Sequence, residues 1–341
     1  MATPAATKLT TPTNVPTATA KPITPASAGL LGHSTVNKVF PIQPGTLPIP
    51  ADYSALGVTR GYSPPTANQL RFFVVGPSGE GKSTFINSDP NSLILDYEKG
   101  STGIPRALAA RISISTAKQH NDFIKKLIAD AKSGRSLWSR IVFDTVDQCI
   151  QILGAAFAAD KGLEHFGEYG DKGAGYGVMK SRFWTDIESL MAAGYTWTIV
   201  GHLTERTVRV NRQDMTVLRP VIFESLNNII YRNCEIFGMT ERVTTVKQGT
   251  VTRTIEGKQV TIAVPGKDIL TEEFMLRISS DVGAGGSSAQ LKQAKVRGVP
   301  SFRKSIKLTG SGGWTTFSTA YNNAVATEKK RLASPVAPVK Q

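Results

Sequence analysis

Residues 76–84, GPSGEGKST, restrict what this chain can fold into more than any other stretch. They follow the apolar run FFVV at 72–75 and fit the spacing G-x-x-x-x-G-K-[ST] of a phosphate-binding loop. Glycines let backbone N–H groups turn toward an anion, and a helix that begins near Gly81 directs its positive end at the same phosphates. The stretch therefore predicts a phosphate loop between a strand and a helix.

The residue types of this loop suit a nucleoside triphosphate. Lys82 can reach the β- and γ-phosphates, where it binds and acts in catalysis, and the Ser83 hydroxyl can ligate Mg²⁺. ATP and Mg²⁺ are therefore the expected cofactors, and a glycine-rich surface turn is the alternative. The predicted nucleotide-binding residues are Gly76, Pro77, Ser78, Gly79, Glu80, Gly81, Lys82, Ser83 and Thr84.

The charge balance indicates an acidic partner. The chain has 341 residues, of which 40% are hydrophobic, and a formal net charge of +14. This length allows one large domain or two small ones with a real core. The excess of positive charge makes nucleic acid the first candidate partner, and a basic surface kept for solubility is the alternative.

Cysteine usage and hydropathy bear on the compartment. Cys149 and Cys234 lie far apart in apolar surroundings and make no zinc-binding spacing, so buried and reduced thiols are expected. No run of about 18 apolar residues and no apolar N-terminal segment occur. Neither a membrane span nor a secretory signal is expected, and a cytoplasmic location is predicted.

Three parts follow one another along the chain. Residues 1–67 are rich in Ala, Thr and Pro, which predicts a disordered tail. Residues 68–281 alternate strand and helix patterns, which predicts an α/β core with a mostly parallel sheet flanked by helices. Its last part alternates polar and apolar residues around Gly249 and Gly257, which predicts β-hairpins. Residues 282–341 are expected to form a flexible loop and a basic C-terminal extension.

Two acids follow predicted strands of the core. Asp144 ends the buried run RIVFD, where it can hold Mg²⁺ through water at the carboxyl edge of the sheet. An ordinary helix N-cap is the alternative for Asp144. Glu98 lies just past the strand NSLILD and can orient or deprotonate the attacking water. Asp96 is its rival, and a solvated loop acid paired with Lys99 is the other alternative.

Other residues near these strand ends can be placed from the pattern. Asp147 is expected in the first turn of the helix after Asp144. His202 ends the strand YTWTIVGH, where it can sense the γ-phosphate and pass the signal to the segment that follows. A partly buried histidine with satisfied hydrogen bonds is the alternative.

The order of GPSGEGKST, LILDYEKG, IVFDT and TIVGH resembles that of RecA-like P-loop ATPases. It looks most like the phage-encoded nucleotide-binding proteins of AAA/RecA type that serve single-strand annealing and recombination. The resemblance covers about residues 70–280 and implies a RecA-like fold. It also implies that Glu98 is the catalytic base, that Asp144 is the acid of the Walker B strand, and that His202 is the residue that senses the γ-phosphate.

The same resemblance implies two loops that face DNA, residues 164–177 and 203–220. The residues expected to contact DNA are Tyr169, Tyr176, Arg206, Arg209 and Arg212, with Arg219 at the end of the second loop. Packing within a glycine-rich lid is the alternative for the tyrosines. Single-stranded DNA is the expected partner, the chain is expected to form a ring or filament of identical subunits, and a single-strand-binding or other replication protein is a further candidate partner.

The leading hypothesis is a DNA-stimulated ATPase. It would act on single-stranded DNA in phage recombination, annealing, repair or replication, in the host cytoplasm. A nucleotide or small-molecule kinase is the second hypothesis, because arginines in 203–220 could form a lid. An assembly or packaging protein that ATP switches is the third.

Overall fold

The computed structural model describes the chain from residue 64 onward, with gaps. The described residues are 64–100, 107–210, 213–247, 250–255, 258–263, 269–278, 295–296, 299, 302, 305–308 and 312–333. They belong to one compact unit, Arg60–Gln341. The predicted disordered tail lies outside the described residues except for its last four, and so does the predicted flexible loop that begins at residue 282. Arg212 lies outside them too.

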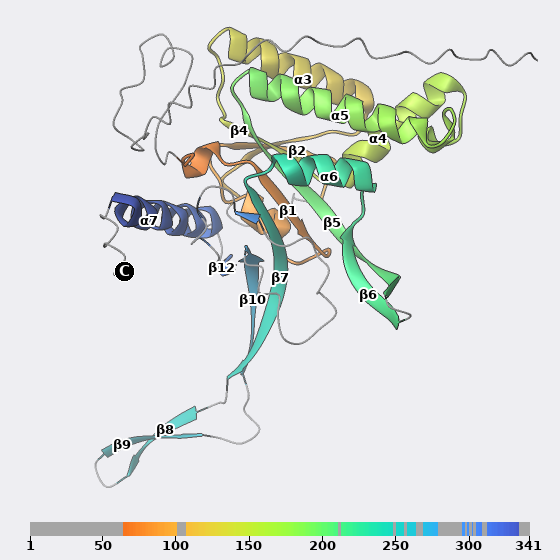
Figure 1. Ribbon diagram of the computed structural model, residues 1–341. Coiled ribbons are helices and arrows are strands. Elements are labelled where there is room, and N and C mark those ends of the chain that lie inside the picture. Colours follow the sequence, from red (N-terminus) through yellow and green to blue (C-terminus); the bar gives the residue numbers. More distant parts are fainter. Residues whose placement is uncertain are drawn as a thin grey trace, which may run out of the picture. The chain divides into compact units, whose positions relative to one another are not determined.

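A mostly parallel sheet forms the centre of the described unit (Figure 1). Its strand order is β12-β10-β7-β1-β5-β4-β2-β3, with β11 paired to β7 and β6 paired to β5. The strands are β1 (Phe72–Gly76), β2 (Ser92–Asp96), β3 (Ala110–Ser113), β4 (Arg140–Asp144), β5 (Thr196–Val210), β6 (Gln213–Pro220), β7 (Ile236–Lys247), β10 (Ile269–Arg277), β11 (Lys295–Val296) and β12 (Ser305–Lys307).

The C-terminal strands pair differently from the N-terminal ones. Strands β1 to β5 and the start of β7 pair in parallel, whereas β10 is antiparallel to β7 and to β12. Strands β8 (Thr250–Ile255) and β9 (Lys258–Ala263) pair with each other as a separate antiparallel ladder. The predicted α/β class, the mostly parallel sheet and the antiparallel C-terminal strands are confirmed.

Helices cover both faces of the sheet (Figure 1). They are α2 (Lys82–Ile86), α3 (Ala117–Lys132), α4 (Val146–Lys161), α5 (Ala174–Ala192), α6 (Glu224–Asn233) and α7 (Gly313–Ala333), with short 3₁₀ turns η1 (Ala67–Gln69) and η3 (Phe166–Glu168). In the described part of the chain, no helix combines the length and the apolar character that crossing a membrane requires. Cys149 and Cys234 are buried free thiols, as predicted.

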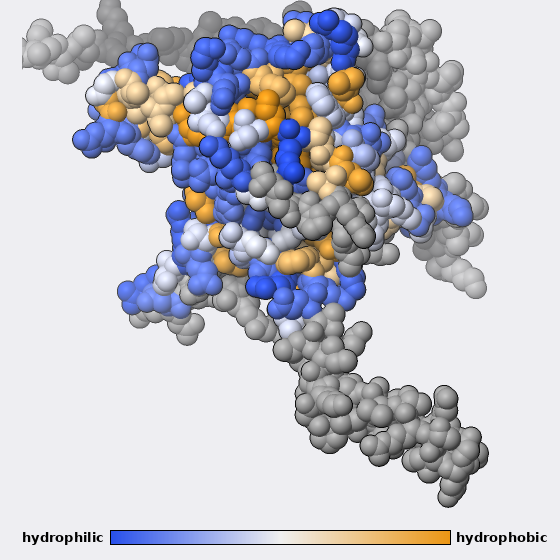
Figure 2. Space-filling view, turned by 180° about the vertical axis from the view of Figure 1, so that it is seen from behind, coloured by the Kyte–Doolittle hydropathy of each residue, from blue (hydrophilic) through white to orange (hydrophobic). Residues whose placement is uncertain are grey.

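Strand β1 shows how the two apolar layers arise. Side chains alternate across a strand, so Phe73 faces the cluster under α3, α4, α5 and α6, and Phe72 faces the cluster under α2 and α7. Every residue of β1, β2 and β4 is buried. Continuous apolar runs are typical of parallel strands with both faces covered, which is why these strands could be found in the sequence. The surface seen in Figure 2 is mostly hydrophilic with smaller hydrophobic areas between.

A buried arginine joins the sheet to the second layer. Arg140 is only 2% exposed, and its guanidinium donates to the Asp89 carboxylate at 3.0 Å and to the Leu70 carbonyl at 2.6 Å. Its Cζ lies 4.9 Å from the ring centroid of Phe72 and 4.8 Å from that of Trp314. Burial lowers the pKa of Arg140, and the charge of Asp89 opposes that effect. This contact therefore ties β4 to β1 and to α7.

Helix α7 lies within the predicted C-terminal extension and packs on the sheet. Its Phe317 ring lies 5.0 Å from Phe72 and 6.1 Å from Phe85, centroid to centroid. The Trp314 backbone N–H donates to Ser88 Oγ at 2.8 Å, and the Tyr321 hydroxyl donates to the Pro65 carbonyl at 3.1 Å. Helix α7 thus shares the hydrophobic cluster of β1 and α2 rather than standing apart from it.

We expect Phe317→Ala to destabilise the fold. The side chain is fully buried among aromatic rings, and truncation of such a residue costs about 3–5 kcal/mol through lost burial and the cavity left behind. The free energy of unfolding in urea measures this. Thr319→Ala, an exposed position of the same helix, is the matched control. Equal effects of the two substitutions would show that α7 does not stabilise the core.

Candidate functional site

The phosphate loop has the predicted position between β1 and α2. Gly79 and Gly81 have φ values of 79° and 86°, in the left-handed region that glycine adopts without strain. Lys82 Nζ donates to the carbonyl oxygens of Gly76 at 2.9 Å and Pro77 at 2.7 Å, so its side chain folds back over the loop. Burial lowers the pKa of Lys82, and the negative charges of Asp144 and Glu98 oppose that effect.

Gly76 lies where no side chain fits. A Cβ on Gly76 would lie 2.2 Å from Thr240 Oγ1 on the neighbouring strand β7. The remaining loop residues, Pro77, Ser78 and Glu80, lie between β1 and α2, and Ser83 and Thr84 follow Lys82 in the first turn of α2. Glu80 also approaches Arg242 of β7, with 3.6 Å between Oε1 and Nη2.

Two buried aspartates end neighbouring strands beside this loop. Asp96 of β2 and Asp144 of β4 are paired in register at the carboxyl ends of their strands. Burial raises the pKa of Asp144 to about 7, and the charges of Glu98 and Asp96 act in the same direction. Lys82 and His202 oppose this effect. Asp144 is therefore a carboxylate whose ionisation a nearby cation would favour.

Asp96 and Glu98 have different roles in the turn after β2. The Asp96 carboxylate accepts hydrogen bonds from the backbone N–H groups of Glu98 at 3.2 Å and Lys99 at 2.7 Å, so Asp96 shapes the turn. The Glu98 carboxylate instead accepts the Thr145 hydroxyl at 2.7 Å and lies 3.2 Å from His202 Nδ1. This geometry favours Glu98 over Asp96 as the acid that acts on a ligand.

His202 contacts both Glu98 and Asp147, and the sequence did not predict the contact with Asp147. Its Nδ1 lies 3.0 Å from Asp147 Oδ2, and its backbone N–H donates to Asp147 Oδ1 at 3.3 Å. The hydrogen bond with Asp147 raises the pKa of His202. Burial acts to raise the pKa of Asp147, but the hydrogen bond from His202 and the positive charge of its ring hold that pKa below its usual value. The pair is therefore stabilised as imidazolium and carboxylate.

The sequence placed Asp147 in the first turn of the helix, and α4 does begin at Val146. Its contact with His202 arises because β4 and β5 are parallel neighbours, which brings the first turn of α4 beside His202 near the middle of β5. Glu98, Asp147 and His202 each offer one ligand atom within 4.8 Å of the others, so these three could also hold a metal ion.

A second histidine, His120, supports the turn after β2 through Tyr97. The Tyr97 hydroxyl lies 2.8 Å from His120 Nδ1, and His120 Nε2 lies 3.0 Å from Asp186 Oδ2. Tyr97 and His120 are buried, and burial raises the pKa of Tyr97 well above its usual value. No pattern in the sequence predicted this series of hydrogen bonds. The series anchors Tyr97, the residue that precedes Glu98.

The second segment implied to face DNA is a hairpin rather than a loop. Strand β5 continues past His202 to Val210 and pairs with β6, so residues 203–210 and 213–220 are antiparallel strands. Thr204 pairs with Arg219, and side chains alternate, so Arg206 shares a face of the hairpin with Arg219. Arg209, an odd number of residues away, lies on the other face and approaches Asp214 at 3.8 Å.

The first implied segment, residues 164–177, contains η3 and the start of α5. Tyr169 and Tyr176 are 37% and 38% exposed. The Tyr169 ring packs on Phe157 at 5.0 Å between centroids, and Tyr176 packs on Phe166 at 5.1 Å and Phe223 at 5.3 Å. Both tyrosines thus pack partly on rings outside residues 164–177, Phe157 of α4 and Phe223 before α6, and keep part of their own rings at the surface.

A strand, a glycine-containing turn with a buried lysine and a helix define a P-loop nucleotide-binding protein. Residues 68–267 match the AAA domain family, and the chain belongs to this family of ATPases. Among curated proteins, none matches the sequence. The family supports nucleotide binding and hydrolysis in general terms.

We expect Glu98→Gln to slow ATP turnover about 100-fold or more while leaving ATP binding largely unchanged. The amide keeps the shape of the side chain but cannot accept a proton from water. Single-turnover hydrolysis and nucleotide affinity, measured on the same preparation, separate these steps. Normal turnover in Glu98→Gln together with lost turnover in Asp96→Asn would identify Asp96 as the base instead.

The pKa of Asp144 predicts a pH-dependent stability in the nucleotide-free protein. The folded carboxyl holds its proton up to about pH 7, whereas the usual value is 3.8, so the folded state binds more protons between these values. Stability contributed by Asp144 is therefore present at low pH and lost as the pH rises through about 7. Asp144→Asn removes this loss.

We therefore expect the melting temperature of Asp144→Asn to exceed that of the wild type at about pH 8, with the difference shrinking toward about pH 4. The measurement needs a chelator and no nucleotide. Asp122→Asn, at an exposed carboxylate whose pKa Lys118 lowers, is the control that should show no such widening. A difference that is constant with pH would mean that Asp144 is already ionised throughout.

Proposed function

We propose that the protein hydrolyses ATP with Mg²⁺ and uses the nucleotide state to control its binding to single-stranded DNA. The observation that supports this is strand β5. Gly76 of the phosphate loop pairs in register with His202, and the same strand continues from His202 to Arg206 without interruption. A shift of the strand at the nucleotide site would therefore move the arginine-bearing hairpin.

The residues around the phosphate loop divide the work of hydrolysis. Lys82 would exchange its loop carbonyls for the β- and γ-phosphates, and Ser83 and Asp144 would hold Mg²⁺. A bound cation favours the ionised form of Asp144, so magnesium binding and proton release are coupled there. Glu98 would orient and deprotonate the attacking water.

The DNA side of the proposal depends on charge and aromatic surface. Arg206, Arg209 and Arg212 would track phosphates, and Tyr169 and Tyr176 would stack on bases. The net charge of +14 favours such a partner. Phage recombination, annealing, repair or replication in a host cytoplasm is the proposed setting, with a ring or filament of identical subunits and a single-strand-binding or other replication protein as partner.

His202 is the proposed link between the two sides. It contacts Glu98 and Asp147 at the nucleotide site, and it precedes the hairpin on the same strand. Such coupling is reciprocal: if ATP tightens DNA binding, DNA must tighten ATP binding by the same factor. The link thus predicts an effect that can be measured from either side.

ATP hydrolysis with and without single-stranded DNA tests the proposed function. DNA should raise turnover in the wild type, and Lys82→Ala should abolish hydrolysis while the fold survives. An ATPase that DNA neither stimulates nor binds would refute the DNA part, and phosphoryl transfer to a small acceptor would indicate a kinase.

We expect His202→Ala to leave nucleotide binding largely intact but to remove the difference in DNA affinity between the ATP and ADP states. Without the imidazole, β5 loses its contacts with Glu98 and Asp147, so a change at the nucleotide site no longer reaches the hairpin through this strand. Fluorescence anisotropy of a labelled oligonucleotide, in each nucleotide state, measures the affinities. If the variant keeps the wild-type difference, the coupling does not run through His202.

A further inference from the structure

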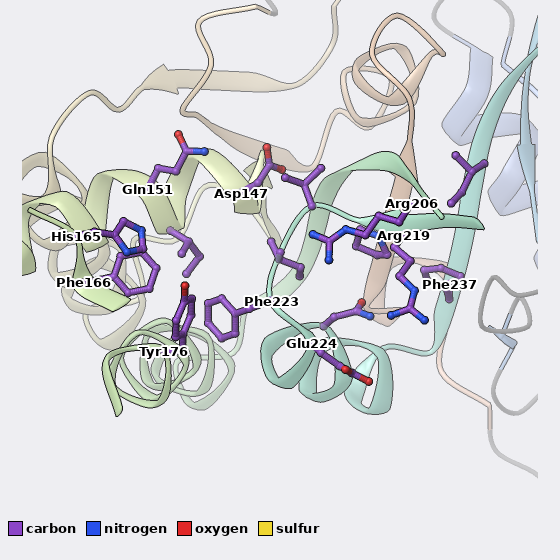
Figure 3. Close-up of a pocket in the computed structure, with 16 residues that line it drawn as sticks. Asp147, Gln151, His165, Phe166, Tyr176, Arg206, Arg219, Phe223, Glu224 and Phe237 are labelled. Atoms are coloured by element: carbon purple, nitrogen blue, oxygen red, sulfur yellow. The ribbon is translucent and has the colours of Figure 1, made fainter. Parts of the chain in front are cut away.

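A pocket of about 580 Å³ lies beside the catalytic cluster (Figure 3). Helices α4, α5 and α6, the turn η3 and the β5–β6 hairpin line it. Its volume is in the range of about 300–1,000 Å³ that small ligands occupy. Asp147 lines the pocket, but Glu98, His202 and the phosphate loop do not, so the nucleotide chemistry described above gives this pocket no role.

The two ends of the pocket differ in chemistry (Figure 3). Phe166, Tyr176 and Phe223 lie at one end, and Arg206 and Arg219 lie at the other. Such a pairing of aromatic rings with guanidinium groups suits a ligand that has a flat ring at one end and a phosphate at the other.

The aromatic end leaves a ring surface free. Phe166 is buried, and Tyr176 packs edge-on against both Phe166 and Phe223 while more than a third of it stays exposed. In an edge-on pair the rim of one ring meets the face of the other, so the ring surface left for a ligand is the exposed part of Tyr176, and every base has a π-face that can stack on an aromatic side chain. Tyr176 is therefore the natural stacking surface.

The arginine end is free to bind an anion. In the described part of the chain, neither Arg206 nor Arg219 makes an ion pair, and both share a face of the hairpin. Two carboxylates also line the pocket: Asp147, which already accepts from His202, and Glu224. Glu224 offsets one of the two arginine charges, and Asp147 is already paired with His202. The net positive charge left for a ligand favours a singly charged phosphodiester over a free nucleotide with two or more negative charges.

We propose that this pocket captures one nucleotide of a single strand, with the base on Tyr176 and Phe223 and its phosphodiester at Arg206 and Arg219. The inference rests on the proposed binding of single-stranded DNA and names the place where one base leaves the strand. Asp147 forms a wall of the pocket and holds His202, so a captured nucleotide lies one residue from the cluster that contains Glu98.

The test uses two labelled oligonucleotides of the same length, one fully abasic and one abasic except for a single thymine. The wild type should bind the thymine-bearing strand more tightly, and Tyr176→Leu should reduce this preference about tenfold because it keeps apolar bulk but removes the aromatic face. Tyr176→Phe should keep the preference. Circular dichroism and ATP affinity confirm that each variant is folded.

Arginine variants test the phosphate end. Arg219→Gln should weaken the thymine preference, because the phosphodiester no longer anchors the nucleotide. Arg209→Gln is the matched control: it removes the same charge from the opposite face of the hairpin and should lower binding to both strands alike. Equal effects of the two substitutions on the preference would overturn the proposal.

Other outcomes separate this inference from the proposed function. If the wild type binds both strands and Tyr176→Leu leaves the thymine preference unchanged, the pocket proposal is wrong and DNA binding stands. If no strand binds but thymidine monophosphate does, and Tyr176→Leu abolishes that binding, then DNA binding and strand capture both fail and the pocket takes a free nucleotide.

Discussion

The buried guanidinium of Arg140 is the contact on which the two-layered core depends. It donates to the carbonyls of Leu70, Ala67 and Asn68, besides Asp89, and it lies over two aromatic rings. A buried charge is costly unless its donors are satisfied. The segment that leads into β1, the turn η1 and helix α7 must therefore all be in place before the buried charge of Arg140 is stabilised. Arg140 begins β4, and the same strand ends in Asp144 at the nucleotide site.

Much of this architecture could be predicted from local patterns. Buried parallel strands are continuous apolar runs, so RFFVV and RIVFD could be recognised, and the phosphate loop has a spacing that its chemistry requires. The interactions of Asp147 with His202 and of Tyr97 with His120 could not be predicted, because they join residues from different elements. The packing of α7 depends on aromatic residues whose partners lie more than 200 positions away.

The sequence also pointed to a loop where β5 extends into a hairpin. A resemblance transfers the position of a segment more readily than its conformation, and the alternation of residues 203–210 is interrupted by charged side chains. The hairpin matters because a paired strand holds its side chains on fixed faces. Arg206 and Arg219 can then act together, whereas Arg209 is directed elsewhere.

One oxygen atom of the Glu98 carboxylate lies within hydrogen-bonding distance of two residues from other elements. Thr145 Oγ1 lies 2.7 Å from Oε1, and His202 Nδ1 lies 3.2 Å from the same atom. In the proposed mechanism, this carboxylate takes the proton of the attacking water. A carboxylate has about four acceptor positions, so Thr145 and His202 leave room for that water while they hold the group in place. Under this proposal, the direction in which the base faces is set by two residues from other elements, Thr145 after β4 and His202 of β5, rather than by the turn that carries Glu98.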